Sequence, residues 1–170
     1  SYGRALEQNR GLRHHRQHQH RVQPRLRAAA AAALVKAIAY LAQNGKVDTN
    51  KIRFHYAGNG IDELREIMSQ YKIAEILEDH GYLPKNKISI LQRNSDLFVV
   101  LSWNTQKEQG VLTGKFYEGI RAKKPILSLI AGNVPNSELY QLNQKYSYGF
   151  CYEVCQEEQQ FDALCAYILN

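Results

Sequence analysis

Long apolar runs are absent from this chain of 170 residues, and cysteine is scarce. Because no apolar stretch approaches the ~18 residues of a membrane-spanning helix, we expect no transmembrane segment. The three cysteines, Cys151, Cys155 and Cys165, are an odd number and lack the paired C-x2-C units of a zinc ribbon. They predict neither a disulfide framework nor a metal centre, and we interpret them as small apolar residues in a reducing compartment.

Lysine is absent from the first 35 residues, where the charge comes from arginine. Residues 1–27 hold seven arginines and one acid, Glu7, which accounts for the whole net charge of +6. Residues 28–170 carry 15 basic and 15 acidic residues and are therefore neutral. A basic patch is the usual mark of a nucleic-acid or anionic-membrane partner. We therefore expect no nucleic-acid partner for the folded part, and at most a peripheral association with a membrane.

Large apolar residues are too few in residues 1–27 to offset the entropy of ordering them. We therefore predict a disordered or irregular arm there, followed by one domain at 28–170. The arm holds four of the six histidines, His14, His15, His18 and His20. Three interpretations stay open: a polyanion-binding arm, a metal-capturing histidine cluster, or a segment foreign to the protein, which we favour.

The rest of the chain alternates between helical periodicity and short β-rich runs. Helices are predicted at 29–43, 62–70, 86–93, 114–122, 137–146 and 157–169, and strands at 52–57, 96–102, 125–130 and 149–153. The stretch 73–81 is ambiguous, with a short helical piece before a brief strand at 80–82. Strands separated by helices imply right-handed crossovers. The predicted fold class is therefore α/β, with a Rossmann-like, doubly wound parallel sheet.

Ligands of such sheets lie beyond the carboxyl ends of the strands, which nominates the loops 58–62, 102–115 and 130–136. The longest loop ends in Thr113-Gly114-Lys115, which places a hydroxyl, an unobstructed amide and a cation at a helix N-terminus. Those are the parts of a phosphate site. Glu118, one turn further on, is suited to a ribose diol. The alternative is a plain N-cap at Thr113 with ordinary surface charges at Lys115 and Glu118.

Several motifs in the middle of the chain resemble a known family. They are Asn94-Ser95-Asp96-Leu97, Trp103-Asn104, Lys107-Glu108-Gln109-Gly110-Val111-Leu112-Thr113-Gly114-Lys115, Tyr117-Glu118 and Lys124-Pro125-Ile126-Leu127. They look like a bacterial branch of glycosyltransferase family four, and the resemblance covers roughly residues 52–149. Those enzymes have the GT-B architecture of two facing Rossmann-like domains, and the C-terminal domain binds the nucleotide-sugar donor.

The resemblance implies a role for each matching residue. Glu118 would hold the donor ribose, and Lys115 would stabilise the leaving diphosphate together with helix amides, so these two are the candidate catalytic residues. Further donor contacts are implied for Thr113, Gly114 and Asn104, for Gly81, Tyr82 and Leu83 beside the nucleobase, and for Gly58 and Gly60, where a structural role is at least as strong. We expect no metal and no cofactor besides the nucleotide-sugar substrate, because residues 28–170 show no clustered aspartate pair or His/Cys ligand set.

The chain departs from the family pattern in two places. The family has paired acids spaced E-x7-E, but Gly110 stands eight residues before Glu118 and Glu108 comes two residues too early. The arm and an alanine run stand where a first strand, its glycine-rich loop and a basic pair are expected. Arg27 or Lys36 are the available substitutes for that pair, without support from the spacing.

Our first hypothesis is the donor half of an enzyme that moves a sugar from a nucleotide diphosphate to a glycan or glycolipid acceptor. The acceptor would be held by a missing N-terminal domain, so the chain alone should bind donor weakly and turn over poorly. Its expected place is the cytoplasm or the inner face of the cytoplasmic membrane. The alternative is a non-catalytic Rossmann-like module that binds a nucleotide or a partner protein.

Overall fold

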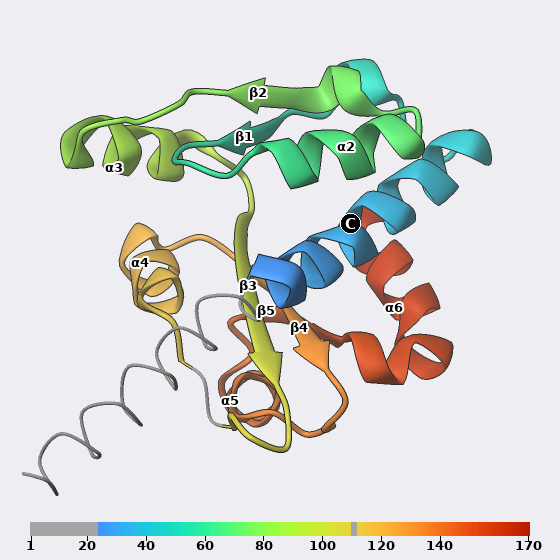
Figure 1. Cartoon of the computed structure of the whole chain (residues 1–170), viewed down its shortest axis with the longest axis vertical. Coiled ribbons are helices and arrows are strands. Elements are labelled where there is room, and N and C mark those ends of the chain that lie inside the picture. The colour runs from blue at the N-terminus through green and yellow to red at the C-terminus, as the bar shows by residue number, and fades with distance from the viewer. Residues whose placement is uncertain (1–23, 110–111) are drawn as a thin grey trace, which may run out of the picture.

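The computed structural model describes residues 24–109 and 112–170, so residues 1–23 of the arm predicted at 1–27 lie outside them. The protein is α/β (Figure 1). Its strands are β1 (Phe54–Tyr56), β2 (Leu77–Asp79), β3 (Phe98–Asn104), β4 (Ile126–Gly132) and β5 (Gly149–Glu153). Its helices are an N-terminal helix (Pro24–Gln43), α2 (Asp62–Gln70), α3 (Lys85–Asn94), α4 (Gly114–Ala122), α5 (Glu138–Tyr146) and α6 (Glu157–Leu169), with short 3-10 turns at Thr49–Lys51, Ala74–Ile76 and Val154–Gln156.

All strand pairings in the described residues are parallel, as the alternating pattern predicts. The strands form two sheets rather than the single sheet we expected: β1 pairs with β2, and β3, β4 and β5 follow one another in that order. The longer strands β3 and β4 are mostly buried because their residues are apolar on both faces. The parallel α/β class is confirmed, and the single continuous sheet is not.

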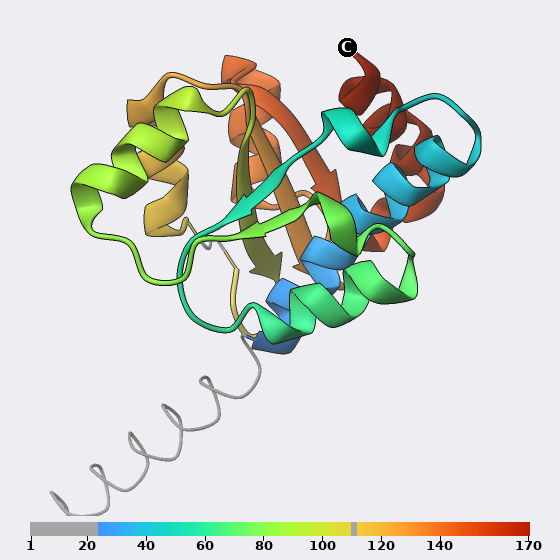
Figure 2. The same ribbon diagram turned by 90° about the horizontal axis from the view of Figure 1, so that it is seen from above.

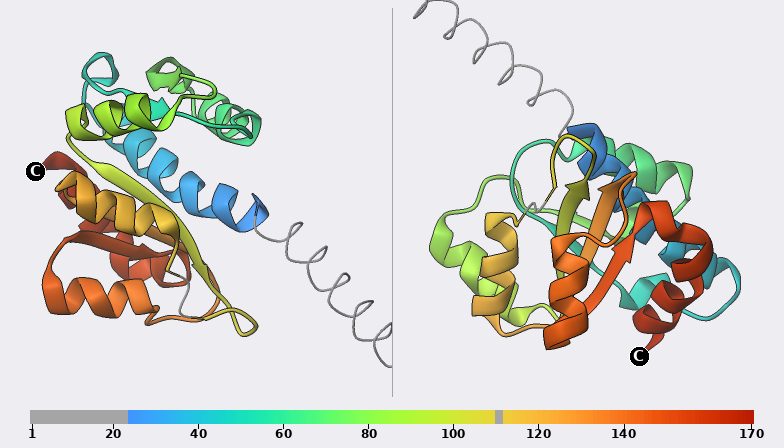
Figure 3. Two further views of the ribbon diagram at one scale, coloured as in Figure 1. Left: turned by 90° about the vertical axis from the view of Figure 1, so that its left-hand side faces the viewer. Right: turned by 90° about the horizontal axis from the view of Figure 1, so that it is seen from below.

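Helices cover both faces of the three-stranded sheet (Figures 2 and 3). Phe98, Val100 and Ile126 point to one face and pack with Phe116 of α4 and Leu139 of α5. The alternate residues of the same strands belong to a larger apolar core with the N-terminal helix and α6. Consecutive side chains of a strand point to opposite faces, so this alternation builds a core on each side of the sheet.

The N-terminal helix lies between the two sheets (Figures 1 and 3). By length and composition alone it is long and apolar enough to cross a membrane. In this fold its apolar residues instead enter the larger core: Ala30, Ala31, Leu34, Val35, Ala37, Ile38, Ala39 and Leu41 are buried. Residues 24–27, which we assigned to the irregular arm, are helical, and Leu26 packs against this core. The arginines on either side of Leu26 masked this apolar anchor in the sequence.

The strand that we placed at 80–82 lies at 77–79. Leu77 packs into the larger core, whereas the acidic residues after it interrupt the apolar pattern and hide the strand in the sequence. Gly81, inside the predicted range, has φ +57°, a left-handed conformation that ends a strand. Among the cysteines, which are all free, Cys151 and Cys165 are buried and Cys155 is exposed.

The ends of β3 and β4 approach closely at Gly132. A Cβ atom at this residue, whose φ is +110°, would lie 2.1 Å from the carbonyl oxygen of Asn104. We predict that Gly132→Ala lowers the free energy of unfolding by about 3 kcal/mol, because it combines a clash with backbone strain. Urea denaturation measures the change. Gly114→Ala is the matched control, since a Cβ atom there meets nothing within 4 Å; equal midpoints for both variants would contradict the prediction.

Candidate functional site

Glu118 is the centre of the predicted donor site, and two donors converge on its side chain. The Nζ atom of Lys115 lies 2.8 Å from its Oε2 atom, and the Nε2 atom of Gln92 donates to the same oxygen at 2.9 Å. Lys115 is one turn earlier on α4, while Gln92 comes from α3. Within the described residues, the other carboxylate oxygen, Oε1, has no hydrogen-bond partner. The carboxylate is therefore fixed through one oxygen and offers the other to a ligand.

The surroundings of Glu118 favour its charged form. Partial burial raises the pKa of the carboxyl, but hydrogen bonds from Lys115 and Gln92, with the positive charges of Lys115 and Arg121, outweigh it. The pKa of Glu118 therefore lies below its ordinary value of 4.5. At neutral pH the side chain is an acceptor, which is the state needed to bind hydroxyl groups.

The N-terminus of α4 begins at Gly114, and no side chain caps it. Thr113 stands at the cap position, yet its hydroxyl does not bond to the helix and its Oγ1 atom is buried without a partner. The plain N-cap that we considered for Thr113 is therefore absent. The side chain of Lys115 is 59% exposed. An uncapped helix start beside an exposed cation offers amide hydrogens and positive charge to an anion.

The loops that follow β1 and β2 meet at Gly58 and Gly81. The amide of Gly58 donates to the carbonyl of Gly81 at 2.8 Å. Gly58, Gly60 and Gly81 all have positive φ, so each glycine has a backbone reason to be there. Tyr82 is 83% exposed and Leu83 is half-buried. An exposed aromatic ring beside this turn gives a base a surface on which to stack.

Asn104 and Glu108 are tied into the scaffold. Asn104 is 3% exposed, and its amide donates to the carbonyl of Val134 at 2.8 Å, which joins the end of β3 to the loop after β4. Its Oδ1 atom is buried without a partner. Glu108 accepts the indole N–H of Trp103 at 2.5 Å. The side chain of Glu108 thus anchors the loop to the core, and the donor role of Asn104 stays a prediction.

The two candidates for the missing basic pair have other partners. The guanidinium of Arg27 lies 5.8 Å from the centre of the Trp103 ring. Lys36 forms an ion pair with Glu157 of α6, and the pKa of its ammonium group is raised mainly by that hydrogen bond. Both side chains therefore tie the N-terminal helix to the rest of the fold.

Sequence reasoning missed Gln92, which carries no motif and reaches Glu118 only through the packing of α3 on α4. It also missed Glu153, a 1% exposed carboxylate that accepts the amides of Asn136 and Ser137 before α5. The third omission is a cluster of His55 on β1, Glu78 on β2 and His80 directly after β2. Its only sequence signal is the i, i+2 spacing of Glu78 and His80, and the misplaced strand concealed that signal.

We predict that Glu118→Gln lowers the free energy of unfolding at neutral pH by at most about 1 kcal/mol, because the ion pair is partly solvated. A carboxyl with a lowered folded-state pKa stabilises the fold above its unfolded pKa and loses that contribution as pH falls through the lowered value. Urea midpoints of variant and wild type should therefore differ near pH 7 and converge in acid. Glu75→Gln, at an exposed acid, is the control; a difference that grows in acid would refute the assignment.

Comparison with known proteins gives no match. No protein-family model matches the chain, and searches of curated proteins and of solved structures find no matching protein. The likeness to glycosyltransferases therefore rests on the sequence motifs alone.

Proposed function

We propose that this chain is the donor-binding domain of a glycosyltransferase that uses a nucleotide-diphosphate sugar. The observation that carries the proposal is Glu118, held by Lys115 and Gln92 one turn inside a helix with an uncapped N-terminus. A carboxylate and a cationic helix start, one turn apart, match the two polar parts of a nucleoside diphosphate, its ribose and its diphosphate.

The ribose would bind the Oε1 atom of Glu118, which has no hydrogen-bond partner among the described residues. A ribose diol presents two hydroxyl donors, and a charged carboxylate is their preferred acceptor. Because Oε2 is fixed by Lys115 and Gln92, Oε1 is oriented before the ligand arrives. Pre-ordering lowers the entropy lost on binding, so a small polar contact contributes more to affinity.

The diphosphate would bind at the N-terminus of α4. The amides of this first turn and the partial positive charge of the helix attract phosphate oxygens, and Gly114 has no side chain to obstruct their approach. The exposed ammonium group of Lys115 lies beside Glu118, so it could contact the diphosphate while it holds the carboxylate that binds the ribose. As the bond to the sugar breaks, negative charge grows on the leaving diphosphate, and these donors stabilise it in place.

The nucleobase would lie against Gly81, Tyr82 and Leu83, where an exposed ring flanks the turn. The parallel α/β fold supports this reading because ligands of Rossmann-like sheets gather at the carboxyl ends of the strands. In the full proposal the domain is one doubly wound half of a GT-B enzyme. It faces an acceptor domain that binds a glycan or glycolipid, in the cytoplasm or at the inner face of the cytoplasmic membrane.

Isothermal titration of the full chain with UDP- and GDP-sugars tests the donor site. We expect Glu118→Ala and Lys115→Ala each to weaken the binding of the preferred donor by about tenfold, the cost of one charged hydrogen bond. Glu138→Ala and Lys145→Ala, at exposed positions of α5, are matched controls that should leave affinity unchanged.

The outcomes separate the proposal from its alternative. If no nucleotide-sugar binds, or if the α4 variants titrate like wild type, the donor site is wrong. If the nucleotide diphosphate alone binds at Glu118 and the sugar adds nothing, the non-catalytic nucleotide-binding module becomes the better account. Each variant is compared with wild type by circular dichroism, so that a loss of folding is not counted as a loss of contact.

A further inference from the structure

Three potential metal ligands are placed on one face of the two-stranded sheet by its register. His55 of β1 lies directly opposite Glu78 of β2 in the parallel pairing. His80 follows Glu78 by two residues, and its amide donates to the carbonyl of Tyr56 at 2.9 Å, which continues the ladder past β2. Because side chains alternate along a strand, these three residues share a face. The neighbouring Phe54 and Leu77 point the other way, into the larger core.

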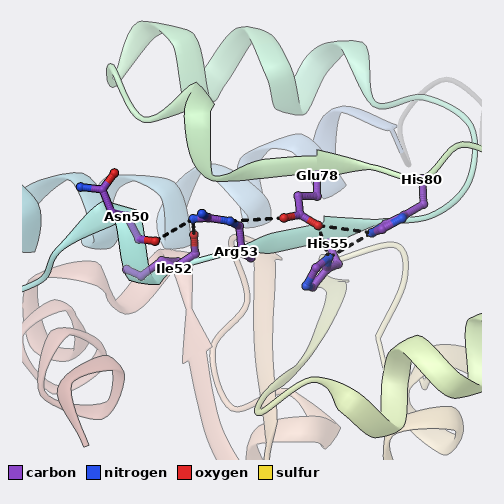
Figure 4. A network of polar contacts seen from close by, with 6 residues as sticks. All are labelled: Asn50, Ile52, Arg53, His55, Glu78 and His80. Atoms are coloured by element: carbon purple, nitrogen blue, oxygen red, sulfur yellow. Dashed lines mark hydrogen bonds and ion pairs between the residues drawn. The ribbon is translucent and has the colours of Figure 1, made fainter.

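The ligand atoms of these side chains converge (Figure 4). The Nδ1 atom of His55 lies 3.0 Å from Nε2 of His80 and 3.1 Å from Oε2 of Glu78, and the last two atoms are 3.9 Å apart. A single point can lie about 2.0 Å from all three atoms, which is the bond length of zinc to imidazole nitrogen and carboxylate oxygen. The side chains thus already surround a position of the right size.

Hydrogen bonding satisfies this arrangement only in part, because the roles of the two ring nitrogens depend on their tautomers. A proton on Nδ1 of His55 must be shared between His80 and Glu78, and without that proton Nδ1 faces the Glu78 carboxylate as a second acceptor. A metal ion accepts a lone pair from each of the three atoms at once. It also balances the negative charge of Glu78 without placing two protonated imidazoles 3.0 Å apart.

The carboxylate is held from behind. The Nε atom of Arg53 lies 3.3 Å from Oε1 of Glu78, the oxygen that is not directed at the histidines. Arg53 is itself fixed, because its Nη1 atom donates to the carbonyls of Asn50 and Ile52 at 3.0 and 2.7 Å (Figure 4). Partners of this kind orient a metal ligand and are a regular part of metal sites. The backbone carbonyls hold Arg53, and Arg53 holds Oε1 of Glu78, so Oε2 remains available to coordinate a metal ion.

We propose that His55, Glu78 and His80 form a binding site for a divalent transition-metal ion, with zinc as the best match. Two imidazoles and one carboxylate are the ligand set of zinc sites that keep a fourth position for water or a substrate oxygen. The side chains are 31%, 42% and 29% exposed, so an ion reaches the site from solvent. This site is separate from Glu118 and does not depend on the proposed sugar donor.

Other groups that can bind zinc, the histidines of the arm and the exposed thiol of Cys155, must be replaced before the site is tested. The experiment uses the full chain with His14, His15, His18 and His20 replaced by glutamine and Cys155 by serine, since these groups also bind zinc. This background protein is titrated with zinc chloride against a competing zinc indicator. We expect one equivalent of zinc to bind and to raise the melting temperature.

In that background, His55→Gln and His80→Gln should each weaken zinc binding by about 100-fold, and Glu78→Gln, which keeps the shape of the side chain, by at least about tenfold. Arg53→Ala should weaken it by about tenfold, the effect of losing a partner behind a ligand. Glu75→Gln, an exposed acid outside the cluster, should change nothing.

Two results would overturn the site: no zinc bound by the background protein, or equal affinity in the background, His80→Gln and Glu78→Gln proteins. If a histidine variant fails to fold, circular dichroism reveals it, and Glu78→Gln and Arg53→Ala still decide the question. Zinc binding that vanishes only when the arm histidines are removed would count against this cluster as well.

Discussion

The fold depends on apolar packing around the N-terminal helix, because the two sheets share no ladder of hydrogen bonds in the described residues. This helix presents four buried alanines, Ala30, Ala31, Ala37 and Ala39, whose small side chains let other elements approach its backbone. Residues of both sheets enter the same core, with Leu77 of β2 and Leu127 of β4 among them. Burial of apolar surface has no direction, so it can join two sheets that no strand pairing connects.

The division into two sheets determines which elements support each of the two polar clusters. The molecule has two parts here: the two-stranded sheet with α2 and α3, and the three-stranded sheet with α4, α5 and α6. A polar contact also connects them, from Gln92 of α3 to Glu118 of α4. The proposed donor site therefore lies where the two parts meet, and each part supplies one of the groups that hold the carboxylate. The histidine cluster, by contrast, belongs wholly to β1 and β2 and the residues beside them. One chain thus carries two polar centres with different structural supports.

Much of the fold could be predicted from the sequence, because periodicity is a local signal. The helix at 114–122 and the strand at 149–153 have the boundaries that the pattern indicated. The strand at 77–79 was misplaced since it is only three residues long and two of them are acidic. Division into two sheets could not be predicted, because strand pairing is a long-range property that periodicity does not encode.

The candidate site could likewise be predicted only in part from the sequence. Lys115 and Glu118 could be placed on one helical face from their spacing alone, and the structure brings them together. Gln92 and the pairing of His55 with Glu78 required contacts across 26 and 23 positions of the chain, and residue types alone do not reveal such contacts. Glu153 is the clearest case, because a buried carboxylate is unexpected until the amides that bind it are known.

The bond between Gln92 and Glu118 has a thermodynamic consequence of its own. A ligand that engages this carboxylate changes the free energy of a contact that joins α3 to α4. By linkage, if the proposed ligand changes the strength of this contact, the contact changes the affinity for that ligand by the same factor. Through a single side-chain amide, the proposed donor site would thus be coupled to the position of α3.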